Sequence, residues 1–184
     1  MDFQTLIKRR QSDRKYDASR KVDRELILQC LEAARLAPSA CNSQPWHFVV
    51  VDDPELLPQM ADAAAGMGMN KFAAQAPVIL AVVLEKMNFT ARIGSVIKDK
   101  EYRLLDVGIA VEHFCLQAAE LGLGTCILGW FNEKKVAKII GVNNHRIPLL
   151  ITLGYSEAPT REKSRKAMEA MASWNRYAEG IKSR

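Results

Sequence analysis

The chain has 184 residues, a length typical of one domain, and its hydrophobic fraction of 48% is enough to form a core. Its longest unbroken apolar run, residues 76–84, is about half as long as a membrane-spanning helix requires, and residues 1–10 lack the apolar stretch of a secretory signal. We therefore expect a cytoplasmic protein that does not contact a membrane. The formal net charge of +5 permits an anionic partner, but the sequence contains no recognisable nucleic-acid-binding module.

Hydrophobic periodicity predicts both helices and strands in the first half of the chain. The expected elements are helices at 2–11, 23–36 and 55–65, a helical turn at 70–75, and strands at 46–51 and 78–84. Asp23 stands in the position of an N-cap, and Pro38 would stop the second helix. Pro54 would occupy the first turn of the third helix.

The second half of the chain is predicted to contain the longest helix. The expected elements are helices at 102–121, 133–140 and 163–180, and strands at 125–130 and 149–154. Gly122 stands where a helix-ending residue of positive φ belongs. The longest helix is apolar around much of its circumference, which indicates burial on several sides and hence a subunit interface. Because helices outnumber strands and do not alternate strictly with them, the sequence predicts one α+β domain over residues 1–184.

Common catalytic and metal-binding motifs are absent from the sequence. Two G-x-G pairs, at 66/68 and 122/124, lack the third glycine of a dinucleotide fingerprint, and each follows a helix where the fingerprint requires a strand. The four cysteines lack the spacing of a zinc site or a disulfide framework, and the three histidines are scattered. We therefore expect no metal site.

Basic residues concentrate in two segments at opposite ends of the chain. These are KRRQSDRK at 8–15 and REKSRK at 161–166. One interpretation is that both are solvated charged faces, as charge runs usually are. The other is that both ends converge on one phosphate-bearing ligand. Composition alone leaves both interpretations open.

Four segments together carry a more specific pattern. They are RRQSDRKYD (9–17), APSACNSQPWHF (37–48), GTCILGW (124–130) and GYSEAPTREKSR (154–165). In this order and spacing they resemble the FMN-dependent nitroreductase family over nearly the full length. The resemblance implies a central, mostly antiparallel sheet flanked by helices, in an intertwined homodimer with two FMN sites at the subunit interface. It also implies ping-pong hydride transfer from NAD(P)H to the flavin and then to a nitroaromatic, a quinone or a related small-molecule acceptor.

The resemblance further implies which basic-segment residues contact FMN. The positions that match the phosphate side of the family's site are Arg10, Ser12, Lys163 and Arg165. Guanidinium and hydroxyl donors suit a phosphate that carries nearly two negative charges. Arg14 matches a cation near the pyrimidine edge of the flavin, where positive charge raises the reduction potential. Gln11 departs from the family, which commonly has a basic or aromatic residue there, but is kept among the expected contacts, whereas Arg9 is out of register and is expected to be a surface charge.

The remaining implied contacts lie on three other segments. The loop residues that would line the ribityl chain and ring of the neighbouring subunit's flavin are Pro38, Ser39, Ala40 and Asn42. Asn70 and Lys71 match a ring-edge contact, while Leu128 and Gly129 match a turn whose backbone N–H faces flavin N5. Segment 86–103 and the partner chain would build the acceptor pocket. Because the cofactor carries the chemistry, no side chain is expected to be catalytic.

Several alternatives to an NAD(P)H oxidoreductase stay open from the sequence. One is a flavin-binding storage or regulatory protein that holds FMN but turns it over slowly. Another is an enzyme of the same fold that fragments flavin or removes halogen from its substrate. A third and weaker alternative is a basic dimer that binds nucleic acid, although we expect no nucleic-acid partner.

Overall fold

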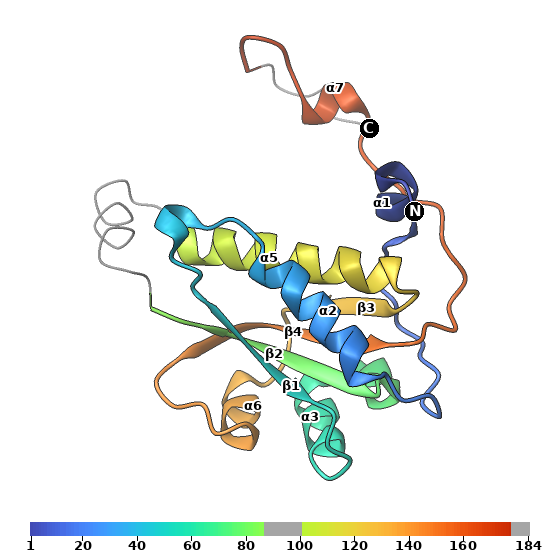
Figure 1. Ribbon diagram of the computed structural model, residues 1–184, viewed down its shortest axis with the longest axis vertical. Coiled ribbons are helices and arrows are strands. Elements are labelled where there is room, and N and C mark those ends of the chain that lie inside the picture. The colour runs from blue at the N-terminus through green and yellow to red at the C-terminus, as the bar shows by residue number, and fades with distance from the viewer. Residues whose placement is uncertain (87–100, 178–184) are drawn as a thin grey trace.

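The computed structural model describes residues 1–86 and 101–177 (Figure 1). Most of segment 86–103, which we expect at the acceptor pocket, lies outside the described residues, as do residues 178–180 of the expected C-terminal helix. Among the described helices, none combines the length and the hydropathy that crossing a membrane requires.

A four-stranded antiparallel sheet forms the centre of the molecule. Its strands are β1 (Trp46–Val51), β2 (Val78–Leu84), β3 (Gly124–Leu128) and β4 (Arg146–Gly154), in the order β1-β2-β4-β3. Every residue of β2 is buried, because β2 is a central strand whose two faces are both covered by helices. The antiparallel sheet and its flanking helices confirm the predicted α+β class.

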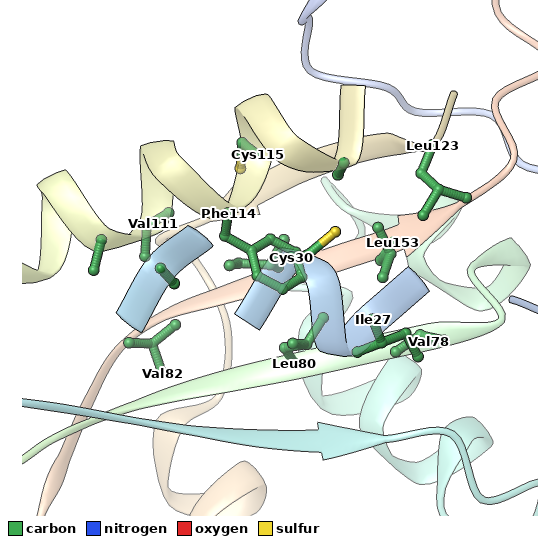
Figure 2. Packing of buried hydrophobic residues seen from close by; sticks show 14 of the residues in the cluster. Ile27, Cys30, Val78, Leu80, Val82, Val111, Phe114, Cys115, Leu123 and Leu153 are labelled. Carbon is green, nitrogen blue, oxygen red and sulfur yellow. The ribbon is translucent and has the colours of Figure 1, made fainter. Parts of the chain in front are cut away.

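Alternate residues of β2 belong to two hydrophobic clusters on opposite faces of the sheet, as the two-residue period of a strand requires. The helices are α1 (Phe3–Arg9), α2 (Arg24–Arg35), α3 (Leu57–Ala64), α5 (Tyr102–Glu120), α6 (Glu133–Ile139) and α7 (Met168–Met171), with 3₁₀ turns η1 (Ala40–Asn42) and η2 (Lys71–Gln75). Val78, Leu80 and Val82 face α2 and α5, where Phe114 is fully buried (Figure 2). The opposite face packs against α3 and α6.

The structure corrects two expectations about element boundaries. Pro54 precedes α3, which begins at Leu57, and Pro58 occupies the first turn instead. Asp53 Oδ1 accepts hydrogen bonds from the two N–H groups of residues 55 and 56, so the segment around Pro54 is a turn. In the described part of the expected C-terminal helix, only α7 is helical, and this tail extends away from the sheet beyond α1 (Figure 1).

Candidate cofactor site

The two basic segments converge on one pocket of about 300 Å³. Its lining residues are Arg10, Gln11, Ser12, Arg14, Arg161, Glu162, Lys163, Ser164 and Arg165. Five of these side chains are cationic and one is a carboxylate. Of the two interpretations of the basic ends, the structure therefore supports convergence over separate solvated faces.

The N-terminal side of the pocket is an extended segment that lies beside β3. Arg10 caps the C-terminal end of α1 with a non-helical backbone (ψ 124°), so the chain leaves the helix in an extended direction. Ser12 then forms a parallel bridge with Thr125, and the N–H of Asp13 donates to the Thr125 carbonyl at 2.8 Å. The edge strand of the sheet thus holds the segment in place.

A buried phenol anchors the far end of this segment. The Tyr16 hydroxyl lies within hydrogen-bond distance of Thr152 Oγ1 (2.7 Å) and donates to the Asp13 carbonyl (2.9 Å). Burial, more than any other cause, raises the pKa of Tyr16 above its usual value of 10.0, so the side chain stays neutral. Tyr16 therefore fixes the direction in which residues 10–16 leave α1.

The C-terminal side of the pocket is tied across the N-terminal side by charged groups. The Arg161 guanidinium donates to the Ser12 carbonyl at 2.8 Å, and the Lys163 ammonium donates to the Arg10 carbonyl. The Arg161 N–H also donates to Gln11 Oε1 at 3.0 Å. Arg161 lies within the basic run REKSRK but was not among the expected site residues. Composition therefore indicated the basic segment, but it did not predict the contacts of Arg161 with Ser12 and Gln11.

The pocket carries more positive charge than its neighbours neutralise. Burial lowers the pKa of Lys163 below its usual value of 10.5, and nearby Arg10, Arg165 and Arg161 lower it further against the opposing effect of Glu112. The Nε atom of Arg10 lies 3.2 Å from Glu112 Oε1, yet it is buried and makes no hydrogen bond with any described residue. A crowded cationic pocket with a buried donor left unsatisfied has the chemistry of an anion site.

The loop that precedes β1 is held at the N-terminal end of α5. The N–H of Ala40 donates to both carboxylate oxygens of Asp106, at 3.2 and 3.1 Å, and the Asp106 side chain is buried. Ser39 Oγ accepts from the backbone N–H of Gln44 at 2.9 Å. Asp106 was not expected as part of the site. The sequence feature that could have indicated it is an acidic residue within an otherwise apolar helical pattern.

This loop also contains an unusual backbone. Cys41, Asn42 and Gln44 all have positive φ, at 50°, 52° and 46°. Such values are uncommon for residues other than glycine and cluster at functional sites. Two side-chain contacts and the Asp106 interaction hold the loop in this conformation.

Within one chain, the loop and the basic pocket are separate. None of Pro38, Ser39, Ala40 and Asn42 lines the basic pocket. The loop is held by Asp106, whereas Arg10 pairs with Glu112 on the same helix. The two helix residues are about 9 Å apart along the axis and on sides that differ by roughly 120°. A single chain therefore does not bring the two groups of expected residues into one site.

Three of the four remaining expected residues meet at the turn after β3. Asn70 Nδ2 donates to the Trp130 carbonyl at 2.8 Å and to the Ala64 carbonyl at 3.1 Å, which joins the loop after α3 to this turn. A Cβ on Gly66 would come within 2.4 Å of the Trp130 carbonyl oxygen, so the contact requires glycine there. Asn70 thus lies next to the turn that begins after Leu128 and contains Gly129. Lys71 instead lines a separate pocket beside α3, so the structure does not bring it to this turn.

Gly129 leaves room for a ligand beside the backbone. No described heavy atom beyond its chain neighbours lies within 4 Å of the position that a Cβ on Gly129 would occupy. Leu128 is buried beneath it, while Trp130 is 57% exposed. A flat group can therefore approach the backbone at Gly129 without displacing a described side chain.

The nitroreductase family model matches residues 7–155, which include the N-terminal basic segment, the loop and the turn. This chain belongs to the nitroreductase family. An oxygen-insensitive NADPH nitroreductase of Helicobacter pylori is 28% identical over 92% of this chain and 94% of its own. An NADH dehydrogenase of Thermus thermophilus is 27% identical over 95% of this chain and 96% of its own.

Solved structures of the nitroreductase family share the fold. An FMN-dependent nitroreductase of Clostridium difficile has a TM-score of 0.75 at 26% identity, and the match covers 94% of this chain and 98% of that one. The predicted nitroreductase-like fold is confirmed.

Proposed function

We propose that this nitroreductase-family chain binds FMN, with the phosphate in the basic pocket, and acts as an NAD(P)H oxidoreductase in a homodimer. The observation that carries the proposal is the convergence of five cationic side chains from both ends of the chain on one pocket. The family match and the printed names of the relatives support the same activity.

The side chains of the pocket are suited to hold a phosphate. Arg10 and Arg165 supply guanidinium groups, which can bind phosphate oxygens through two parallel hydrogen bonds. Lys163 supplies a point charge, and Ser12 supplies a hydroxyl donor. The unsatisfied Nε of Arg10 and the lowered pKa of Lys163 are both features that an anion in this pocket would relieve.

When bound, FMN supplies a ring that accepts a hydride from a reduced nicotinamide and passes it to an acceptor in a second half-reaction. The residues of the chain bind and orient this ring. Gly129 leaves open space for close approach, and Asn70 holds the neighbouring loop against the turn. The charge of Arg14, which lines the same pocket, would favour the reduced and more negative ring. No side chain is required as a nucleophile.

A homodimer accounts for the separation of the expected residues within one chain. The loop at 38–42 does not reach the basic pocket of its own chain, so we assign it to the flavin of a second copy. The exposed face of α5 supports this assignment, because Leu104, Leu105 and Ile109 are 48%, 61% and 39% exposed there. Exposed leucine and isoleucine side chains gathered on one helix are typical of a surface that another chain covers.

Anaerobic mixing of the FMN-loaded protein with NADH or NADPH tests this proposal. The flavin absorbance is expected to bleach on a catalytic timescale and to return when a quinone or a nitroaromatic compound is added. Bleaching that takes many minutes with both nucleotides would instead support a storage or regulatory protein. A screen of acceptors with the reduced protein would then identify the substrate class.

A further inference from the structure

The Gln11 side chain links the two basic segments through its amide. Its Nε2 donates to the Pro159 carbonyl at 3.1 Å, and its Oε1 accepts from the Arg161 N–H at 3.0 Å. The amide therefore contacts the backbone on both sides of Thr160, donating to one neighbour and accepting from the other. In a parallel β-sheet, the backbone N–H and C=O of one residue make the same pair of hydrogen bonds to the two neighbours of a residue on the next strand. The Gln11 side-chain amide therefore pairs with residues 159–161 as the backbone of a neighbouring strand would.

Asp13 fixes the orientation of the Gln11 amide. The Asp13 carboxylate is buried and accepts from Gln11 Nε2 at 2.9 Å and from Ser156 Oγ at 2.6 Å. Because a carboxylate and the Pro159 carbonyl are both acceptors, only the NH₂ end of the amide can face them. Both hydrogens of the Gln11 amide are thus used within the protein, and its oxygen is used by Arg161.

Upstream of Pro159, residues 156 and 157 are joined to residues 13–16 by the Ser156 hydroxyl and by backbone hydrogen bonds. From Arg161 onward, the other hydrogen bonds between the described parts of the two segments come from cations that also line the pocket. Arg161 and Lys163 donate to backbone carbonyls of residues 12 and 10, but both side chains line the pocket and are accessible to an anion. The cations that line the pocket carry like charges and repel one another. Burial is the main cause of the lowered pKa of Lys163, and the neighbouring arginines lower it further. In the absence of an anion, this repulsion opposes the closed arrangement, whereas the neutral Gln11 amide supports it.

We propose that Gln11 is a positioning residue that clasps residues 159–161 onto residues 11–13 and so holds Lys163 and Arg165 at the pocket before an anion binds. This inference rests on the proposed function. Groups that are already in place lose less freedom when a ligand binds, so the clasp strengthens binding of the phosphate and leaves binding of the flavin ring unaffected. Gln11 thereby sets the preference of the chain for flavin with a phosphate over flavin without one.

The variant Gln11→Met tests the clasp, because methionine has a similar length but cannot form the three hydrogen bonds. Gln4→Met, on the exposed surface of α1, is the matched control. Affinities for FMN and riboflavin are measured by flavin fluorescence in phosphate-free buffer. We expect Gln11→Met to bind FMN about tenfold more weakly than the parent and riboflavin within about twofold of it. Gln4→Met is expected to match the parent for both ligands.

Two results would overturn the clasp. One is an unchanged FMN affinity in Gln11→Met. The other is an equal loss for FMN and riboflavin, since that result indicates a general disturbance of the fold. If the methionine variant is shown by circular dichroism to be unfolded, Gln11→Asn, which keeps an amide but is one methylene too short to bridge, takes its place with the same outcomes.

Amide hydrogen exchange of the flavin-free protein tests the clasp independently of FMN. The Arg161 N–H is expected to exchange about tenfold faster in Gln11→Met than in the parent, because its acceptor is gone. Unchanged exchange over residues 159–163 would contradict the clasp. A parent protein that binds no FMN would contradict only the proposed function, and the exchange result would still decide the role of Gln11.

Discussion

Arg10 joins the basic pocket to the long helix α5. Its Nε lies beside Glu112, its backbone carbonyl accepts from Lys163, and its side chain is 24% exposed at the pocket. The ion pair with Glu112 thus places the guanidinium beside α5, and the contact from Lys163 holds the Arg10 main chain, while Nε has no hydrogen-bond partner among the described residues. A phosphate at Arg10 would therefore meet a side chain that is already near the pocket and has a donor to satisfy.

Replacing either pocket arginine is expected to weaken FMN binding selectively. Arg10→Ala and Arg165→Ala each remove a charge-assisted contact, which should cost about 1.5–3 kcal/mol, or roughly a tenfold to a hundredfold loss in FMN affinity. Riboflavin, which lacks the phosphate, should bind as it does to the parent. The measurement is titration of each variant with both flavins.

Arg9→Ala is the matched control for these variants. Arg9 precedes Arg10 directly but lies outside the lining of the basic pocket. We expect its removal to leave FMN affinity within about twofold of the parent, as for a surface charge that does not line the basic pocket. An equal loss of FMN affinity in Arg9→Ala and Arg10→Ala would contradict the assignment of the phosphate to the pocket.

FMN affinity is expected to decrease at alkaline pH because of Lys163. Burial and neighbouring arginines lower its pKa below 10.5 in the flavin-free chain, and a bound phosphate would raise it again. FMN binding therefore takes up a proton between the lower and the higher pKa, and affinity decreases as pH rises through this interval. Riboflavin affinity, measured at the same pH values, corrects for titration of the flavin ring. The variant Lys163→Arg stays charged over this range, so its FMN affinity should change less with pH than that of the parent. A profile that Lys163→Arg does not alter would contradict this linkage.

Composition showed two basic segments in the sequence but left open whether they meet. Arg10, Lys163 and Arg165 were expected at a phosphate because they match positions of the family that the sequence resembles, and the structure places all three in one pocket. The roles of Gln11 and Asp13 depend on partners more than 140 positions away in the chain, at Arg161 and Ser156. No local pattern encodes such contacts, so the fold had to be known first.

At the scale of elements, the extended segment at 10–16 is the part of the fold that positions the site. It lies beside the edge strand β3 and is held there by the bridge from Ser12 and by the buried phenol of Tyr16. Within this segment, Tyr16 alone belongs to a hydrophobic cluster of the described residues. Its conformation therefore depends on a few hydrogen bonds more than on hydrophobic burial.

Tyr16→Phe is expected to lower the free energy of unfolding by about 1–3 kcal/mol, because it leaves the Thr152 hydroxyl and the Asp13 carbonyl without their buried partner. Chemical denaturation measures this change. Tyr155→Phe, at a half-buried ring that lies under the Arg20 guanidinium, is the control and should change stability by less than about 0.5 kcal/mol. Equal stabilities of Tyr16→Phe and the parent would contradict the anchoring role.

Elements with a buried face were the ones that the sequence predicted well. Strands β1 and β2 occupy residues 46–51 and 78–84, as predicted, since their apolar runs face cores that the same chain supplies. The C-terminal tail has helical composition, but it extends away from the sheet and has no packing partner among the described residues that would stabilise a long helix. The composition of the tail therefore predicted a longer helix than α7, which is the helical part among the described residues.

At the scale of the whole molecule, the exposed face of α5 requires an explanation that the described residues of a single chain do not supply. The sequence predicted burial of this helix on several sides, whereas Leu105 and Ile109 are exposed and a Cβ on Gly108 would meet no described atom within 4 Å. A helix with an open apolar face and a glycine in it can receive a second helix closely. This face is where we expect the second copy to pack.

Leu105→Arg combined with Ile109→Arg is expected to prevent dimerisation, since burying two unpaired charges is costly. Sedimentation should show a dimer for the parent and a monomer for the variant, and the variant should lose tight FMN binding because the loop at 38–42 is no longer supplied by a partner. Leu28→Arg, at an exposed leucine of α2, is the control and should remain dimeric. A monomeric variant that binds FMN as tightly as the parent would contradict a shared site.

Basic residues from both ends of the chain are expected to bind the phosphate of a flavin. Calorimetric titration of the flavin-free parent in phosphate-free buffer tests it most directly. One FMN should bind per chain, and riboflavin should bind at least about a hundredfold more weakly, which corresponds to ~2.7 kcal/mol of phosphate contacts. Equal affinities for FMN and riboflavin, or a protein that stays colourless with FMN, would contradict the account.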